Sequence, residues 1–175
     1  APGAAVPGLG RDRQRVGVEA LVAEARRAFA QENTWRKRFE CLEPVMRDTF
    51  PIASIIIVTY NNLDLNRLCL QSLFTNTDWP RFEVIVVDNA STDGTRAMLS
   101  REFPAAKSIL NDTNARWAAG NNLGAAAAVG DTLLFLNSDT VLRPGALAGF
   151  TAFFDGHPQA DLAGCRLLNA DGTLQ

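Results

Sequence analysis

Three aspartates, Asp88, Asp93 and Asp139, are the side chains in this sequence that could together hold a divalent metal ion. Asp88 directly follows the apolar run at residues 82–87, and Asp139 closes the polar turn after residues 133–136. Carboxylate oxygens are hard ligands that suit Mg²⁺ or Mn²⁺, ions commonly held by one or two side chains and the phosphates of a substrate. Each aspartate alone is also an ordinary turn residue or helix N-cap. Together they predict a metal site, and Asp88 could instead accept hydrogen bonds from a base or ribose.

Apolar runs that end in polar side chains indicate how this site is positioned. Residues 52–58, 82–87 and 133–136 are typical of strands, and we expect the last to be a central strand covered on both faces. The polar ends that follow them are, in order, Thr59-Tyr60-Asn61, Asp88-Asn89 and Asn137-Ser138-Asp139. Ligands of open α/β sheets bind outside the carboxyl ends of the strands, so these three ends are expected to meet at one rim.

Helical patterns separate the strands. Apolar residues recur at three-and-four spacing, and Asp64 and Pro144 stand where an N-cap and a first helical turn are expected. The predicted helices cover residues 18–29, 35–43, 65–76, 95–103, 118–129 and 144–155; further strands are expected at 108–110 and 160–165, and a hairpin at 167–174. Strands that alternate with helices through short connections imply parallel pairing. The predicted fold class is α/β, with a doubly wound, mostly parallel sheet.

Composition excludes several classes of function. The 175 residues are 47% hydrophobic, which is enough for a compact domain. The net charge of -2 gives no indication of a basic surface that would bind nucleic acid. No apolar run approaches the roughly 20 residues of a membrane helix. The cysteines Cys41, Cys69 and Cys165 are odd in number and widely spaced, which favours small buried hydrophobes in a reducing compartment over a disulfide framework. We therefore expect a cytoplasmic protein.

The standard phosphate and hydrolase motifs are missing from the sequence. There is no P-loop with its Lys-Ser/Thr pair, and Gly120-Asn-Asn-Leu-Gly124 lacks the triple glycine of a dinucleotide site and precedes its strand. The single histidine, His157, stands at a helix end beside Pro158 and cannot assemble a Ser-His-Asp triad. Dehydrogenases, P-loop NTPases and serine hydrolases are thereby disfavoured.

Four blocks in fixed order resemble the nucleotide-sugar-binding half of family 2 glycosyltransferases of the GT-A fold, close to the rhamnosyltransferase-like members. The blocks are Ser54–Asn61, Glu83–Gly94, Asn114–Gly124 and Leu134–Asp139, within a match of about residues 51–175. The resemblance implies a nucleotide pocket lined by three residues, a base- or ribose-binding aspartate with two neighbours, and a loop and helix start near the sugar diphosphate. These groups are, in that order, Thr59, Tyr60 and Asn61; Asp88 with Asn89 and Ser91; and Gly120 with Asn121.

The segment Asn137-Ser138-Asp139 corresponds to the Asp-X-Asp motif of that family, with Asn137 in place of the first aspartate. The resemblance implies that Asp139 is the main protein carboxylate on Mg²⁺ or Mn²⁺. It further implies inverting transfer from a UDP- or dTDP-sugar to a glycan or another hydroxyl acceptor, with a general base beyond Gln175. The chain by itself is expected to be inactive.

The resemblance also divides the chain. Residues 1–17 are expected to be disordered or a linker, 18–50 a helical extension and 51–175 the GT-A nucleotide-sugar-binding domain without its acceptor half. Further domains of a longer chain are expected as partners, and these could place the protein at the cytoplasmic face of a membrane. Two alternatives remain: a non-catalytic GT-A-like binding or scaffolding module, and a nucleotidyltransferase, which the absence of Gly and Lys at 59–62 disfavours.

Overall fold

The computed structural model describes residues 23–32, 34–49 and 52–175. The contacts within the chain group it into two units, Ala1–Thr49 and Phe50–Gln175. The linker predicted over residues 1–17 lies outside the described residues, as does the start of the helix predicted at 18–29.

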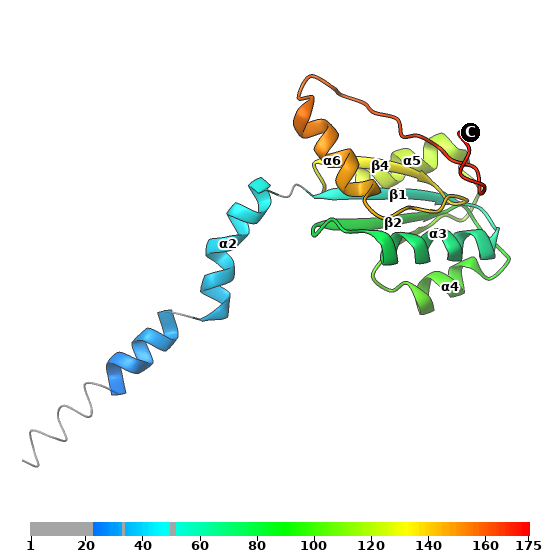
Figure 1. The fold of residues 1–175 in the computed structure, drawn as a ribbon. Coiled ribbons are helices and arrows are strands. Elements are labelled where there is room, and N and C mark those ends of the chain that lie inside the picture. Colours follow the sequence, from blue (N-terminus) through cyan, green and yellow to red (C-terminus); the bar gives the residue numbers. More distant parts are fainter. Residues whose placement is uncertain (1–22, 33, 50–51) are drawn as a thin grey trace, which may run out of the picture. The chain divides into compact units, whose positions relative to one another are not determined.

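The first unit consists of helical residues 23–32 and helix α2, Trp35–Thr49 (Figure 1). Thr34 caps α2, since its hydroxyl accepts a hydrogen bond from the Lys37 amide at 3.3 Å and its carbonyl accepts one from the Arg38 amide at 3.1 Å. The predicted end of this helix at Pro44 is wrong, because Pro44 lies inside α2. A proline removes one backbone donor, but the residues after it remain free to continue the helix.

The second unit is built on four parallel strands. They are β1 (Ala53–Thr59), β2 (Phe82–Asp88), β3 (Lys107–Leu110) and β4 (Thr132–Asn137), and their order in the sheet is β3-β2-β1-β4. Every pairing is parallel. The predicted α/β fold with a doubly wound parallel sheet is confirmed.

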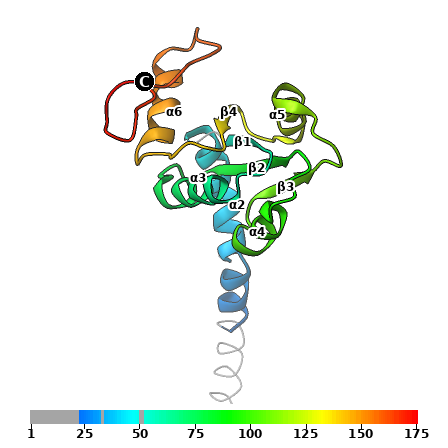
Figure 2. The ribbon, with the colours of Figure 1, turned by 90° about the vertical axis from the view of Figure 1, so that its right-hand side faces the viewer.

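Helices cover both faces of this sheet (Figures 1 and 2). They are α3 (Leu63–Asn76), α4 (Thr95–Glu102), α5 (Arg116–Ala127) and α6 (Ala146–Gly156). The path from β1 through β2 to β3 runs one way across the sheet, and β4 then pairs with the other side of β1. Because parallel crossovers are right-handed, this reversal puts α5 on the face opposite α3 and α4.

Alternate side chains of β1 lie on opposite faces of the sheet. Ile55 and Ile57 pack in the main core together with Leu70 and Leu73 of α3. On the other face, Ile56 and its neighbours meet α5, where glycines allow a close approach: a Cβ at Gly124 would overlap the Ile56 side chain. A strand buried on both faces explains the unbroken β-branched run in the sequence.

The expectation that residues 133–136 form a central strand is wrong. Within the described residues β4 is an edge strand, with Leu133 40% and Phe135 46% exposed on the α5 side. Leu134 and Leu136 pack against the main core on the other side. A short apolar run does not tell one covered face from two, and β1 is the central strand instead.

Helix α3 also departs from the prediction. Its N-cap residue is Asn62, which makes no side-chain capping bond, and Asp64 is not the cap. Leu65 and Leu68, which fit the three-and-four apolar spacing of the predicted helix, are 45% and 48% exposed, whereas Asn66 is buried. Leucine is usually buried more often than asparagine. Here Asn66 is the buried residue, because its side chain forms hydrogen bonds to the neighbouring loops.

The C-terminal elements are less regular than predicted. Pro144 precedes α6 and is not part of its first turn, and residues 160–165 form no strand. The predicted hairpin is present only as an antiparallel bridge between Leu168 and Leu174, with Gly172 at φ 85°. Two of the cysteines expected to be buried, Cys41 and Cys165, are exposed, and only Cys69 is buried.

The contact between α5 and β1 gives a stability prediction. Gly124→Ala should lower the free energy of unfolding by about 1–3 kcal/mol, because the new methyl group overlaps Ile56 in a packed layer. Gly149→Ala in α6 is the control, since a Cβ there meets no atom within 4 Å and alanine favours the helix by roughly 0.5–1 kcal/mol. Urea unfolding of both variants measures the difference. Equal effects of the two substitutions would show that α5 does not press on β1 in this way.

Candidate functional site

Strand register brings the predicted polar ends to one edge of the sheet. Thr59 pairs with Asp88 across β1 and β2, and Val58 pairs with Asn137 across β1 and β4. Figure 2 looks onto this edge. The three polar strand ends predicted from the sequence therefore do lie side by side, in the position where α/β sheets bind ligands.

Asp88 is the most deeply placed residue of this rim, with 0% exposure. Its Oδ2 accepts a hydrogen bond from Arg96 Nε at 2.6 Å and one from the Ser91 amide at 3.1 Å. Arg96 also donates to the carbonyl of Asn111, which ties the ends of β2 and β3 together. The other carboxylate oxygen, Oδ1, is buried and has no partner within the described residues. A buried acceptor left without a donor is unfavourable by about 1–3 kcal/mol, so Oδ1 is available to a donor from a ligand.

Asn89 is buried next to Asp88 and fastens the loops on the α5 side. Its amide donates to the Thr59 carbonyl at 2.8 Å. Its side-chain Nδ2 donates to the Arg116 carbonyl at 3.2 Å, and its Oδ1 accepts from Asn111 Nδ2 at 2.8 Å. With both side-chain atoms used in this way, Asn89 sets the shape of the rim.

A buried hydrogen-bond network joins the first two loops, and its centre, Asn66, was missed by the sequence analysis. Thr59 Oγ1 donates to Asn66 Oδ1 at 2.7 Å. Asn66 Nδ2 donates to the Asn61 carbonyl at 2.6 Å and to Thr95 Oγ1 at 3.3 Å. Thr59 is itself buried, so its hydroxyl serves this network. Asn66 gives no signal in the sequence beyond a polar residue at a helix position that faces inward.

Asp93 completes the network as a cap for two helices. Its Oδ2 accepts from the Leu63 amide at 2.8 Å, and its Oδ1 accepts from the Thr95 amide at 3.1 Å and hydroxyl at 2.7 Å. Desolvation alone would raise the pKa of Asp93, but the hydrogen bonds from Thr95 and Leu63 outweigh it and lower the pKa. Asp93 is thus a structural cap, and the predicted cluster of three metal-binding aspartates is not found. Among residues 23–32, 34–49 and 52–175 no three His, Cys, Asp or Glu side chains gather in a metal-binding group.

Left-handed backbone conformations concentrate at this rim. Asn61, Asn62, Ala90 and Arg116 all have positive φ, between 58° and 66°. Such conformations are unfavourable for residues with a side chain and persist where the surroundings fix them. The Asn61 amide donates to Ser91 Oγ at 2.7 Å, and its Oδ1 accepts from the Thr92 amide at 2.8 Å. These bonds join the loops after β1 and β2, and leave Tyr60 between them 51% exposed.

The predicted diphosphate residues lie on α5. Gly120 lets the helix approach β1, because a Cβ there would be 2.8 Å from Val58 Cγ1. Asn121 is 7% exposed, and its Nδ2 donor has no partner within the described residues. The rim therefore includes one acceptor, on Asp88, and one donor, on Asn121, that the chain leaves unused.

The turn after β4 presents Asp139. The Asn137 carbonyl accepts hydrogen bonds from the Thr140 amide at 3.2 Å and hydroxyl at 2.6 Å, which closes the turn. Asp139 and the Asn137 side chain are exposed, and Ser138 is half-buried. One free carboxylate beside an amide oxygen fits Mg²⁺ or Mn²⁺ when substrate phosphates supply further ligands.

Cys69 of α3 packs against this turn, with Sγ 3.6 Å from the Asn137 carbonyl. Burial raises the pKa of its thiol to about 11, and the charge of Asp139 adds to that shift. Cys69 is therefore a protonated, buried donor and not a nucleophile.

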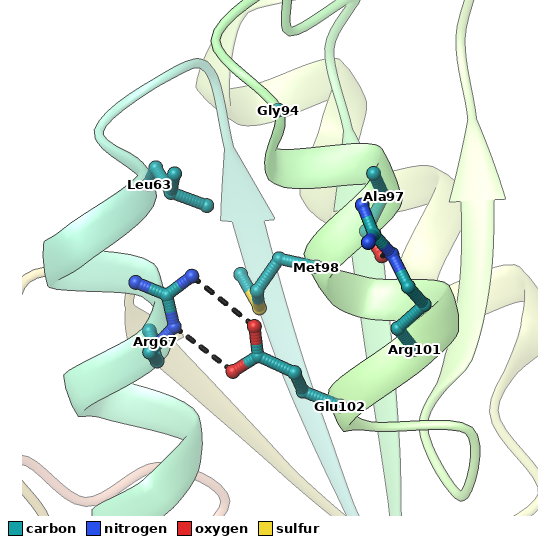
Figure 3. A pocket seen from close by; sticks show the side chains of 7 residues that line it. All are labelled: Leu63, Arg67, Gly94, Ala97, Met98, Arg101 and Glu102. Carbon is teal, nitrogen blue, oxygen red and sulfur yellow. Dashed lines mark hydrogen bonds and ion pairs between the residues drawn. The ribbon is translucent and has the colours of Figure 1, made fainter.

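A groove of about 450 Å³ lies between α3 and α4, apart from the predicted site residues (Figure 3). Arg67 crosses it to Glu102, with Nε to Oε2 at 2.9 Å and Nη2 to Oε1 at 3.1 Å. Leu63 and Met98 line its floor. The groove is bridged by an ion pair of its own residues and includes none of the rim residues.

Comparison with solved structures places the fold among GT-A glycosyltransferases. The chain is similar to S. aureus TarS 1-349, with a TM-score of 0.55 and 32% identity over 61% of this chain and 33% of that one. The same TarS fragment in complex with UDP-GlcNAc gives a TM-score of 0.56. A mannosyltransferase from Pyrobaculum calidifontis, PcManGT, in complex with GDP-Man and Mn²⁺, gives 0.55 at 27% identity over 60% of this chain and 32% of that one.

The sequence profile described as Glycosyl transferase family 2 matches residues 54–175. The chain therefore belongs to glycosyl transferase family 2. It is 34% identical over 128 residues to the O-antigen biosynthesis protein RfbC of Myxococcus xanthus, covering 71% of this chain and 10% of that protein. It is also 34% identical over 100 residues to the glycosyltransferase AglE of Haloferax volcanii, covering 54% of this chain and 32% of AglE. The chain thus spans a third or less of the length of these relatives.

None of the helices in the described part of the chain is long and apolar enough to cross a membrane. The cytoplasmic location expected from the sequence stays a prediction.

The cap at Asp93 gives a pH-dependent prediction. Because folding lowers the pKa of Asp93, the charged carboxylate stabilises the native state fully above the ordinary aspartate pKa. This stabilisation is lost progressively as the pH falls from there through the lowered pKa of the native state. Asp93→Asn should therefore be less stable than the wild type at pH 6, and the gap should narrow towards pH 3. Urea unfolding of both proteins at these two values measures the gap. If the difference in free energy of unfolding is the same at both pH values, the charge of Asp93 does not contribute to the cap.

Proposed function

We propose that residues 51–175 form the donor-binding part of an inverting, metal-dependent glycosyltransferase. Its donor is a UDP- or dTDP-sugar, and its acceptor is a hydroxyl group of a glycan or another molecule, as in polysaccharide biosynthesis. The observation that carries the proposal is the unpartnered, fully buried Oδ1 of Asp88 at the edge where β1, β2 and β4 end. We propose that residues 18–50 are a helical extension that does not take part in this function.

Asp88 is proposed to recognise the base or ribose. Arg96 and the Ser91 amide hold Oδ2, which orients the carboxylate and leaves Oδ1 to accept an N–H of the base or a hydroxyl of the ribose. The exposed ring of Tyr60 supplies a face for stacking, and Thr59 and Asn61 fix its position through the Asn66 network. Similarity to chains whose structures hold UDP-GlcNAc or GDP-Man supports a nucleotide-sugar ligand.

The sugar diphosphate is proposed to bind between α5 and the turn after β4. The amino end of α5 carries the partial positive charge that favours phosphate groups. Gly120 keeps this helix close to β1, and Asn121 has a free buried donor. Asn89 and Ser91 keep the neighbouring loops in place.

Asp139 is proposed to hold Mg²⁺ or Mn²⁺, with Asn137 and Ser138 beside it. Such an ion would neutralise the charge that develops on the nucleoside diphosphate as it leaves. Asn137 contributes a neutral oxygen, so the protein supplies a single negative charge at this turn. The Mn²⁺ in the complex of PcManGT supports a divalent ion in a related site.

Inverting transfer needs a base for the acceptor hydroxyl, and we assign none among these residues. We propose that it belongs to an acceptor-binding part beyond Gln175, in keeping with the third or less of RfbC, AglE and TarS 1-349 that the chain spans. By this proposal the chain binds a donor but does not complete the transfer on its own.

A second candidate is a GT-A-like module that binds a nucleotide sugar or a partner without catalysis. The amide of Asn137, in the place of a carboxylate, favours it. The two candidates differ in metal dependence: the transferase site should bind a nucleotide more tightly with Mn²⁺, whereas a module that has lost the metal should not.

Calorimetric titration with UDP and dTDP, with and without Mn²⁺, tests the proposal. Asp88→Asn should weaken metal-free binding about tenfold or more, because it removes a charged acceptor from a buried site. Asp139→Ala should leave metal-free binding unchanged and abolish the increase in affinity that Mn²⁺ gives.

Asp64→Ala is the control for these variants, since Asp64 is exposed and contacts only Arg67 among the described residues. Circular dichroism confirms that each variant folds. Nucleotide binding that is the same in all three variants would refute the assigned site.

A further inference from the structure

We propose that three side chains of α3, Cys69, Ser72 and Asn76, form a positioning row that holds Asp139 at its working place. This inference rests on the proposed function, because it concerns the turn that would carry the metal. The three residues recur at three-and-four spacing and therefore lie on one face of the helix. Each makes a hydrogen bond to the backbone of the segment 137–142, which contains Asp139.

The hydrogen bonds fix both ends of this segment. Cys69 Sγ donates to the Asn137 carbonyl at 3.6 Å at the first end. At the other end, the Leu142 amide donates to Ser72 Oγ at 2.9 Å, and Asn76 Nδ2 donates to the Leu142 carbonyl at 2.8 Å. Both backbone polar groups of Leu142 are thus bonded to α3.

Asp139 lies between these two anchors and is exposed. The side chain of Leu142 is buried in the main core, which adds an apolar anchor to the polar ones. The Ser72 hydroxyl donates to the Cys69 carbonyl at 2.8 Å, so its lone pair is oriented towards the Leu142 amide. The turn is therefore held by the helix while its carboxylate remains free to bind a ligand.

The same helix holds the nucleotide side of the rim. Asn66, one turn before Cys69, bonds Thr59 and the Asn61 carbonyl. Helix α3 consequently fixes two loops that are far apart in sequence, the one with Tyr60 and the one with Asp139. Moving one loop relative to the other requires breaking buried hydrogen bonds to α3.

Burial makes this arrangement specific. Ser72 and Cys69 are buried, and a buried polar group without its partner is unfavourable, so alternative placements of the 137–142 segment are disfavoured. Functional groups need to be held to roughly 0.5 Å by their supporting residues. A site with one protein carboxylate depends on that placement more than a site with two, because no second charge retains the ion when the first is displaced.

The test uses the whole chain and the variants Ser72→Ala and Asn76→Ala, which remove the two bonds to Leu142. Hydrogen exchange should become faster at the amides of 138–142, because their anchor is lost. In calorimetric titrations with UDP, metal-free affinity should stay within about twofold, while the increase in affinity on adding Mn²⁺ should fall about tenfold, as is usual for residues that orient a metal ligand.

Ser72→Thr retains a hydroxyl acceptor and should restore the Mn²⁺ effect, which a loss of general stability would not allow. Thr75→Ala is the matched control on the exposed side of α3 and should behave as the wild type. Faster exchange with an unchanged Mn²⁺ effect, or no change in either measurement, would overturn the positioning role. Failure of the proposed function has a different signature, since the wild type itself would then bind UDP no more tightly with Mn²⁺.

Discussion

The in-register parallel pairing of β1 with both β2 and β4 is the constraint on which the rim depends. It places Thr59 beside Asp88 and Val58 beside Asn137, so the loops that follow all start from the same edge. A shift of β1 by one residue would take Ile56 and Val58 away from Gly124 and Gly120, the glycines that leave room for them on α5. The apolar interior thus determines where the polar groups outside it lie.

Hydrogen bonds then fix the loops that follow these strands. Asn66, Asp93 and Asn89 use their side-chain atoms on neighbouring backbone groups or side chains, and they retain little capacity for a ligand. Asp88 Oδ1 and Asn121 Nδ2 are the exceptions among the described residues, since both are buried and unpartnered. Because most buried polar atoms of a folded protein are satisfied, these two unsatisfied atoms are where the proposed ligand contacts are assigned.

The sequence predicts the strands, their shared edge and the fold class, because β-branched runs and polar ends report burial and direction locally. Prediction from the sequence fails where the role of a residue depends on partners that are distant in the sequence. Asp93 looks like a metal ligand in the sequence, but in the structure it caps the Leu63 amide. Asn66 gives no signal in the sequence, because its role depends on partners from the loops after β1 and β2. Residues 133–136 look like a central strand in the sequence, because an apolar run does not show whether other strands pair with it on both sides. The roles assigned to the rim residues stay predictions.

Because residue 137 is asparagine and not a carboxylate, the position of the single charge on Asp139 matters more for the proposed metal site. In the proposed metal site, one negative charge at the turn instead of two would reduce the electrostatic attraction for a divalent ion, and the phosphates of the donor would be a larger share of its ligands. Metal binding would then depend on the nucleotide already being in place, which requires the loop carrying Tyr60 and the turn carrying Asp139 to keep a fixed separation. Both are bonded to α3, so by the proposed function the rigidity of this helix would compensate in part for the missing second carboxylate.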